Sequence, residues 1–287
     1  MITVVIVSFH SQHLILKRIS EIGADVPIII VENSKDIELK KKIEFQYSNV
    51  KVLIPEKNLG WGKAVNLAIH ESKTDYIYLI QPDIVLLDGC IKKLIDCISN
   101  FKDFAILTPI NINQKDHINY ATYVKKNKAA IDNKYDLEEV DHVDLSWVLN
   151  KKELKDIDYW DENIFLYYET FDLCKRLRDK NKKIYISKKI TTSHLGSKSH
   201  TENLEFQSLL NRNWHYNWSK FYYFKKHHGY FFGLKKTLPN LIRSLKKYIS
   251  SRFFSKNDEY KLYYAEISGL ISSYLKKPAS YRPYEKK

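Results

Sequence analysis

Four short apolar runs, separated by segments with helical periodicity, organise the N-terminal part of the chain. The runs lie at residues 2–7, 26–31, 50–54 and 76–80, and the helical segments at residues 13–22, 37–47 and 62–72. Continuous β-branched runs are typical of strands buried on both faces of a parallel sheet. Strands that alternate with helices predict a doubly wound α/β fold, in which a mostly parallel sheet is flanked by helices.

The rest of the chain is less regular. Residues 111–142 are polar and predict a loop or an irregular hairpin, whereas residues 143–149 and 183–187 predict two further strands. From about residue 206 the pattern is helical and rich in Trp, Tyr, Phe and Lys. We therefore expect one large domain, residues 1–205, followed by a helical, basic and aromatic-rich appendage, residues 206–287.

Most of the positive charge lies in that appendage. Residues 201–287 contain 17 Lys and Arg and 6 Asp and Glu, so 11 of the 13 net positive charges of the chain belong to them. Such asymmetry favours an anionic partner, for which the candidates are a membrane surface, a nucleic acid and an acidic polymer.

Five apolar residues of the appendage recur at helical spacing, namely Leu241, Ile242, Leu245, Tyr248 and Ile249, with basic residues around them. Basic amphipathic helices of this kind commonly lie in membrane interfaces. Alternatively, the stripe packs on the large domain or on a second subunit of a homo-oligomer. Basic patches among aromatic residues also suit single-stranded nucleic acid. We expect no nucleic-acid partner, because the sequence contains no signature of a nucleic-acid-binding module.

The cysteines and the hydropathy pattern predict a cytoplasmic protein. Cys90, Cys97 and Cys174 have no C-x-x-C spacing and lie in expected helices, so we expect buried thiols of a reducing compartment. No apolar stretch reaches the roughly 18 residues of a membrane span, and Met1 leads into an apolar run without a basic segment or cleavage site.

Polar residues follow each of the first four strands. In doubly wound sheets, ligands bind beyond the carboxyl ends of the strands. The residues at these positions are Ser8-Phe9-His10, Glu32-Asn33-Ser34, 56–60 and Gln81-Pro82-Asp83.

Two carboxylates, Glu169 and Asp172, stand three residues apart at the start of an expected helix, which turns both towards one face. Aromatic residues precede and separate them, and a carboxylate in such surroundings can serve as a general base. Alternatively, Glu169 is a helix cap and Asp172 a first-turn acid favoured by the helix dipole.

Taken in order, these motifs resemble those of the family 2 glycosyltransferases, which have the Rossmann-like GT-A fold. The resemblance rests on Val7-Ser8-Phe9, Val31-Glu32-Asn33-Ser34, the segment from Asn58 to Asn66, Gln81-Pro82-Asp83, residues 159–162 and residues 165–176. It covers roughly residues 1–228 and is nearest to the rhamnosyltransferase-like branch of bacterial surface-polysaccharide biosynthesis.

The resemblance implies that residues 1–110 bind the nucleotide-sugar and residues 111–205 the acceptor. The implied donor-binding residues are Ser8, Phe9, Glu32, Asn33, Asn58, Gly60, Gly62, Asn66 and Gln81. Glu32 would accept a hydrogen bond from a pyrimidine N3–H, where the family usually has Asp. Gly60 and Gly62 would let the donor approach a helix N-terminus, although for either glycine alone a glycine-rich turn that only leads into the helix is the favoured explanation.

The resemblance also implies a Mn²⁺ or Mg²⁺ site. Gln81-Pro82-Asp83 occupies the place of the family's Asp-x-Asp, so Asp83 would be the charged ligand, and His194 matches a position that can complete the site. A lone histidine is more often structural.

The activity so implied is metal-dependent, inverting transfer from dTDP-rhamnose or a UDP-hexose to a bacterial cell-surface glycan. The acceptor would be lipid-linked, as in lipopolysaccharide or capsule assembly, and the enzyme peripheral at the inner face of the cytoplasmic membrane. Glu169 would be the base; Thr170 replaces a second acid of the family, which leaves Asp172 as the alternative. Because Glu32, Gln81 and Thr170 depart from the commonest residues, the rival hypothesis is a catalytically inactive GT-A scaffold that binds or assembles other components.

Overall fold

The chain is divided into two compact units. A computed structural model describes residues 1–113, 118–123, 134–195, 205–254 and 258–283. The first unit contains residues 1–160 and 173–200, and the second contains residues 161–172 and 201–287. We call them the sheet unit and the helical unit.

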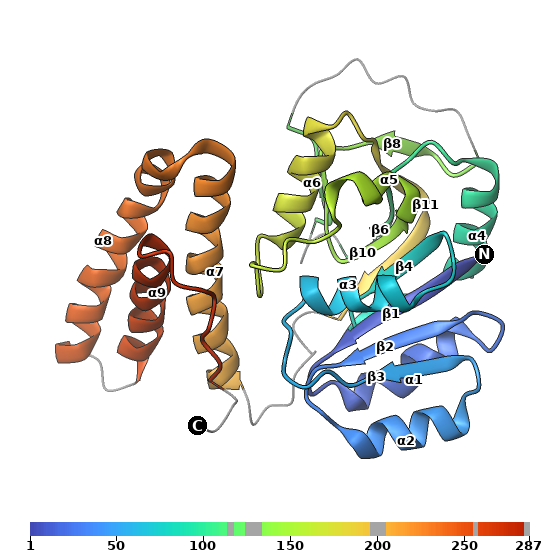
Figure 1. Cartoon of the computed structure of the whole chain (residues 1–287), viewed down its shortest axis with the longest axis horizontal. Coiled ribbons are helices and arrows are strands. Elements are labelled where there is room, and N and C mark those ends of the chain that lie inside the picture. The colour runs from blue at the N-terminus through green and yellow to red at the C-terminus, as the bar shows by residue number, and fades with distance from the viewer. Residues whose placement is uncertain (114–117, 124–133, 196–204, 255–257, 284–287) are drawn as a thin grey trace. The chain divides into compact units, whose positions relative to one another are not determined.

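The sheet unit is built on a nine-stranded sheet (Figure 1). Its first half is parallel, in the order β3 (Val50–Leu53), β2 (Ile28–Glu32), β1 (Ile2–Ser8) and β4 (Tyr76–Ile80). The sheet continues through β10 (Ser146–Asn150), β6 (Ile106–Asn111), β11 (Ile184–His194) and β5 (Ile84–Leu86). The ninth strand, β8 (Leu137–Glu139), also pairs with β11. Strand β10 is antiparallel to β4 and β6, and β5 is antiparallel to β11. The mostly parallel α/β sheet expected from the sequence is confirmed.

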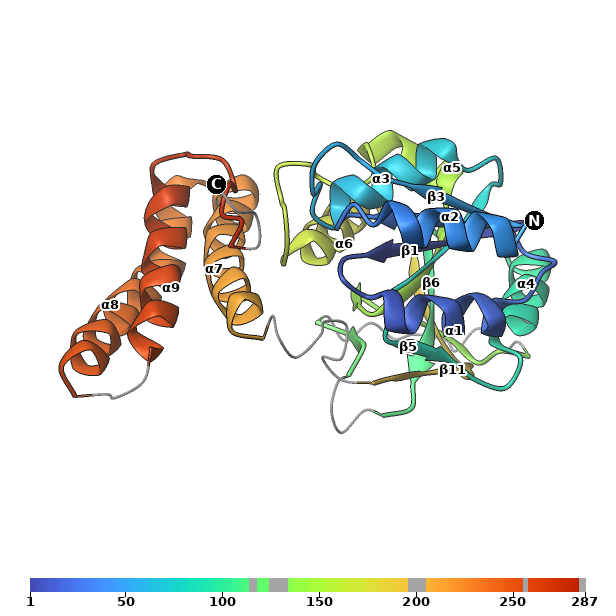
Figure 2. The ribbon, with the colours of Figure 1, turned by 90° about the horizontal axis from the view of Figure 1, so that it is seen from below.

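Helices cover both faces of this sheet (Figure 2). Alternate residues of β1 point to opposite sides: Val4 and Ile6 belong to one apolar core, and Val5 and Val7 to the other. Helices α1 (Gln12–Ile22), α2 (Ile37–Gln46) and α4 (Cys90–Asn100) close the first core. Helix α3 (Gly62–Glu71), the short α5 (Lys151–Leu154) and the end of α6 (Glu169–Asp179) close the second, next to the 3-10 turn η1 (Lys155–Ile157). Burial on both faces explains why these strands are continuously apolar.

The four N-terminal strands, the three helices between them and the two later strands were predicted correctly to within a few residues, although β11 runs further than expected. Strands β5 and β6 were missed. The first has only three residues, and the second contains Pro109. Within the predicted loop, the described residues form β7 (Tyr120–Ala121), β8 (Leu137–Glu139) and the start of β9 (His142–Val143), while 114–117 and 124–133 lie outside the description. The antiparallel pair β7 and β9 agrees with an irregular hairpin.

The helical unit consists mainly of α7 (Glu205–His228), α8 (Tyr230–Phe254) and α9 (Glu259–Tyr274), as the pattern after residue 206 predicted. Trp214, Trp218 and Ala265 form its apolar centre. At Gly269, helix α9 lies against the backbone of α7, and a β-carbon there would overlap the carbonyl oxygen of Trp214. Within the described ranges, no helix has both the length and the apolar character needed to span a membrane.

All three cysteines are buried thiols, as predicted. Burial raises the pKa of the Cys90 and Cys174 thiols to about 12 and that of Cys97 to about 11. A raised pKa keeps a thiol protonated at neutral pH, which disfavours a role as a nucleophile.

We expect Gly269→Ala to destabilise the helical unit, although alanine favours helices more than glycine does. The added methyl group must push α9 away from Trp214, at a cost of about 1–3 kcal/mol. Denaturant unfolding followed by tryptophan fluorescence measures the loss. The control is Ser272→Ala on the same helix, which we expect to leave stability nearly unchanged. An unchanged or higher midpoint for Gly269→Ala would contradict the close approach of α9 to α7.

Candidate functional site

Two fully buried polar side chains lie next to each other where β1 and β2 end. Ser8 and Glu32 are paired in the register of these strands, and neither is exposed. Oε1 of Glu32 accepts hydrogen bonds from the backbone N of Ser34, at 2.7 Å, and from its hydroxyl. Oε2 of Glu32 and Oγ of Ser8 have no hydrogen-bond partner among the described residues. Buried polar atoms normally have partners, so this pair fits a ligand that donates to one and accepts from the other.

Asn33 connects the end of β2 to the turn before α3. Its Nδ2 donates to the carbonyl of Gly60 at 3.0 Å, and its Oδ1 accepts from the backbone N of Leu59 at 3.2 Å. Oδ1 of Asn58 accepts from Gly60 N at 2.9 Å, and Gly60 has a φ of 77°, a conformation that favours glycine. The structure therefore brings Asn33, Asn58 and Gly60 together, beside the strand that ends in Glu32.

Gly62 and Asn66 contact the chain itself. The side-chain amide of Asn66 donates to the carbonyl of Trp160 at 2.9 Å and accepts from the backbone N of Trp160 at 3.1 Å. A β-carbon on Gly62 would lie 3.0 Å from that of Trp160. These contacts give both residues a structural role in holding Trp160; binding of the donor by them stays a prediction.

Asp83 and His194 are brought together by β5 and β11. Nε2 of His194 lies 3.2 Å from Oδ2 of Asp83, and the backbone N of Leu195 donates to the carbonyl of Asp83 at 3.0 Å. Asp83 is 2% exposed and His194 16%. A carboxylate oxygen and an imidazole nitrogen are suitable ligands for Mn²⁺, so the two residues fit a partial site that phosphate and water would complete. No group of three or more potential metal ligands occurs within the described ranges.

The two remaining predicted donor residues follow β1 and β4. Phe9 packs edge-on against the ring of His10, with ring centroids 4.5 Å apart. Gln81 comes directly after β4, and its carbonyl accepts from the backbone N of Ile84 at 3.1 Å. Strands β1, β2 and β4 are parallel neighbours, so Phe9, Glu32 and Gln81 all lie at the carboxyl-terminal ends of these strands.

Arg18, on α1, is a residue that sequence reasoning missed. Its side chain is fully buried, pairs with Glu21, and donates from Nη1 to the carbonyl of Ile84 at 2.6 Å. Burial lowers the pKa of the guanidinium, opposed by Glu21 and by the charge of Asp83. Arg18 thus supports the backbone next to Asp83. In the sequence, the feature that could have pointed to Arg18 is its position as a single arginine on the apolar face of a helix.

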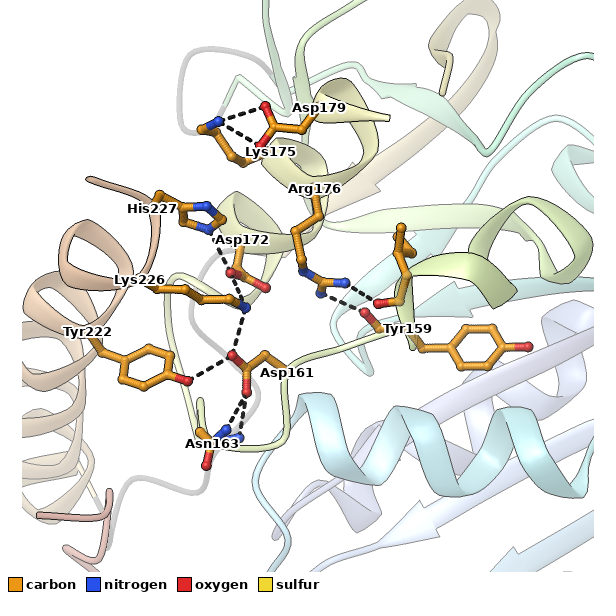
Figure 3. Close-up of polar contacts among 11 residues, drawn as sticks. Tyr159, Asp161, Asn163, Asp172, Lys175, Arg176, Asp179, Tyr222, Lys226 and His227 are labelled. Atoms are coloured by element: carbon orange, nitrogen blue, oxygen red, sulfur yellow. Dashed lines mark hydrogen bonds and ion pairs between the residues drawn. The ribbon is translucent and has the colours of Figure 1, made fainter. Parts of the chain in front are cut away.

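One lysine joins the two ends of the segment that carries Glu169 (Figure 3). Nζ of Lys226, on α7, lies 2.7 Å from Oδ2 of Asp161 and 2.7 Å from Oδ1 of Asp172. Nε2 of His227 lies 2.8 Å from the same oxygen of Asp172, and the hydroxyl of Tyr222 donates to Asp161 at 2.9 Å. Asp172 has no exposed surface. Its contacts fit an anchor to α7 better than a base that must reach a substrate.

Glu169 begins α6 directly after two residues with left-handed backbone. Tyr167 has a φ of 63° and Tyr168 a φ of 67°, a conformation that costs non-glycine residues energy and often occurs at functional sites. The ring of Tyr168 packs against Phe171, Tyr216 and Tyr223, with centroid distances of 5.3, 5.3 and 5.5 Å. The rings of Tyr168 and Phe171, which flank Glu169 in the sequence, thus pack with two aromatic rings of α7.

Sequence reasoning also missed Lys226 and His227. They belong to the run Lys225-Lys226-His227-His228, which reads as part of a basic surface. Nothing in their local pattern identifies their partners, which lie 54 to 65 residues earlier in the chain.

We expect Lys226→Met to destabilise the helical unit by roughly 2–4 kcal/mol, because it leaves buried carboxylates without their shared cation. Burial raises the pKa of Asp161, but the hydrogen bonds from Lys226 and Asn163 outweigh it and leave that pKa lowered. Asp161 therefore stabilises the fold above its unfolded pKa of about 4, and this contribution disappears as the pH falls through the lower folded pKa.

Denaturant unfolding at several pH values measures both effects. The difference in the free energy of unfolding between the wild type and Lys226→Met should be largest near pH 7 and shrink below about pH 4. Lys235→Met, which removes an exposed lysine of α8, is the matched control and should have little effect at any pH. A difference of equal size for the two variants would contradict the bridging role of Lys226.

Comparisons with known proteins identify the family of the chain and structures of similar fold. The model of the family described as glycosyl transferase family 2 matches residues 3–158. Among the curated proteins, none matches the chain.

Three solved structures are similar in fold. The mannosyltransferase PcManGT from Pyrobaculum calidifontis, in complex with GDP-Man and Mn²⁺, is 7% identical, with a TM-score of 0.55 over 95% of this chain and 86% of that one. GalNAc-T7 with UDP, GalNAc and Mn²⁺ is 11% identical, with a TM-score of 0.54 over 88% of this chain and 58% of that one. S. aureus TarS 1-349 in complex with UDP is 15% identical, with a TM-score of 0.51 over 96% and 90%. At these identities the likeness concerns the fold.

Proposed function

The chain belongs to glycosyl transferase family 2, and we propose that it is an inverting glycosyltransferase that uses a pyrimidine nucleotide-sugar. The donor is dTDP-rhamnose or a UDP-hexose, and the acceptor is a lipid-linked glycan of the bacterial cell surface. Residues 1–205 form the catalytic domain and residues 206–287 its helical appendage. The observation that carries the proposal is a pair of buried polar atoms, of Ser8 and Glu32, which have no hydrogen-bond partner in the described part of the chain.

The chemistry of this pair favours uracil or thymine. The base-pairing edge of uracil and of thymine presents an N3–H donor between two carbonyl acceptors. Oε2 of Glu32 accepts from N3–H, and the hydroxyl of Ser8 donates to a neighbouring carbonyl. Guanine offers two adjacent donors and so needs two free acceptor oxygens, whereas Oε1 of Glu32 is already occupied by Ser34. GDP-Man in one structural neighbour and UDP in two others make both nucleotide classes worth testing.

Asp83 and His194 would hold a divalent cation, Mn²⁺ or Mg²⁺, at the donor diphosphate. When bound, this cation neutralises charge that develops on the leaving diphosphate. Support comes from the separation of 3.2 Å between the two side chains and from the Mn²⁺ in two of the structural neighbours. Arg18 keeps the backbone beside Asp83 in place.

Glu169 is the general base. It takes the proton of the acceptor hydroxyl while that oxygen forms a bond to the anomeric carbon. The bond from the anomeric carbon to the diphosphate oxygen breaks, and the nucleoside diphosphate leaves with the electron pair. Attack from the face opposite the leaving group inverts the anomeric configuration. Asp172 acts through its ion pair with Lys226, which holds the start of α6.

The charge of the C-terminal region supports a location at a membrane. A lipid-linked acceptor lies at a membrane, and the net charge of +11 in residues 201–287 supports a position at the inner face of the cytoplasmic membrane.

We expect the wild type to bind UDP at least about tenfold more tightly than CDP, because cytosine N3 is an acceptor and cannot donate to Glu32. In Glu32→Gln, the oxygen remains with Ser34 and an NH₂ group takes the place of Oε2, which suits cytosine. The preference should therefore vanish or reverse. Calorimetric titration with both nucleotides measures it, with the exposed Asp25→Asn as control. An unchanged UDP preference in Glu32→Gln would remove the support for pyrimidine recognition by Glu32.

We expect Glu169→Gln to bind the donor like the wild type and to lose about 10²- to 10⁴-fold in transfer, because only proton removal is affected. Release of UDP or dTDP from the donor, with and without acceptor lipid, measures this. Glu162→Gln, an exposed acid of the same segment, is the matched control. Normal transfer in Glu169→Gln would refute the assignment of the base. Absence of both donor binding and transfer in the wild type would favour an inactive scaffold.

A further inference from the structure

Helix α8 has its apolar side turned outwards. Its buried residues are small, namely Gly233, Thr237, Ser244 and Ser251. Seven of its large apolar residues are exposed, namely Phe231, Phe232, Leu238, Ile242, Leu245, Ile249 and Phe253. A helix on the surface of a soluble protein normally shows the opposite arrangement. We propose that this outer face of α8 docks on an anionic phospholipid bilayer.

Six of the exposed residues form a single stripe. They are Phe231, Leu238, Ile242, Leu245, Ile249 and Phe253, which follow one another at intervals of seven, four, three, four and four residues. These intervals keep side chains on one side of a helix. Phe231 is 83% exposed, Ile249 56% and Phe253 77%. Contiguous exposed apolar surface of this kind marks a site of interaction with a membrane or a protein.

Only three of the five residues in the stripe predicted from the sequence are exposed in the structure. Ile242, Leu245 and Ile249 are exposed, but Leu241 and Tyr248 are partly buried, and Tyr248 packs against Tyr260 and Tyr264 of α9. The predicted set of five therefore combines the outer stripe with residues that hold α8 to its neighbour.

The basic residues beside the stripe indicate which kind of partner binds this face of α8. Helix α8 contains six basic residues and no acidic one, and these are Lys235, Lys236, Arg243, Lys246, Lys247 and Arg252. Only Arg243 has an acidic partner within the described ranges, Glu266 at 3.6 Å. A surface hollow of about 570 Å³ is lined by Pro239, Ile242, Arg243, Lys246 and Lys247, so it combines apolar and cationic groups.

A bilayer with anionic headgroups matches both properties, because the apolar side chains enter the boundary of the acyl chains while the lysines meet the phosphates. Two copies of this face would bring like charges together, which opposes self-association. The inference rests on the proposed function and assigns its membrane contact to one face of α8. Vesicle binding can nevertheless be tested separately, because it needs neither a donor nor sugar transfer.

The test is flotation of the full chain with vesicles of phosphatidylcholine, with and without phosphatidylglycerol. We expect the wild type to float with the anionic vesicles and not with the neutral ones, and to be released at high salt. Phe231→Ser/Ile249→Ser should weaken binding at least about tenfold, because two apolar side chains are lost from the contact. Lys235→Gln/Lys246→Gln should weaken binding to the anionic vesicles as well. Phe45→Ser removes a side chain that is 96% exposed on α2 and is the matched control.

Three results would overturn the proposal. They are failure of the wild type to float, equal flotation with neutral and anionic vesicles, and loss of binding in Phe45→Ser as large as in Phe231→Ser/Ile249→Ser. Sedimentation of the same variants tests whether the face binds a second copy of the chain instead. If the wild type is a dimer and Phe231→Ser/Ile249→Ser is a monomer, the face serves self-association. Nucleotide binding measured in parallel distinguishes failure of membrane docking from failure of the proposed transferase.

Discussion

The ion pairs of Lys226 with Asp161 and Asp172 organise the part of the molecule on which the proposed chemistry depends. These two acids stand at the ends of the segment that carries Glu169, and one ammonium group lies 2.7 Å from both. Charges taken out of water are favourable only when they are paired with good geometry, so the segment and α7 depend on each other. The aromatic contacts of Tyr168 with α7 add to this coupling.

The C-terminal helices thus hold the segment that carries the candidate base. The helical unit contains residues 161–172, and with them the candidate base Glu169. A base must be held within hydrogen-bond reach of its proton, and small displacements reduce the rate strongly. The left-handed backbone at Tyr167 and Tyr168 is consistent with a segment that is fixed by its surroundings. The same unit carries the outward apolar stripe of α8, for which we propose docking on a membrane.

The sequence predicted most of the sheet, because strands buried on both faces leave continuous apolar runs and their carboxyl ends carry the polar residues. It therefore offered Ser8, Glu32 and Asp83 as candidates, and the structure brings Asp83 next to His194 through β5, which is too short to show in the sequence. It missed Arg18 and Lys226, whose roles come from partners far along the chain. The periodicity of α8 identified an amphipathic helix but not its orientation, because small buried residues such as Ser244 leave no apolar signal.

The most direct test of the account is a titration of the full chain with UDP, dTDP and GDP, each with and without Mn²⁺. The account predicts that UDP or dTDP binds, that GDP binds more weakly, and that Mn²⁺ increases the affinity through Asp83 and His194. Tighter binding of GDP, or binding of no nucleotide with or without the cation, would contradict it.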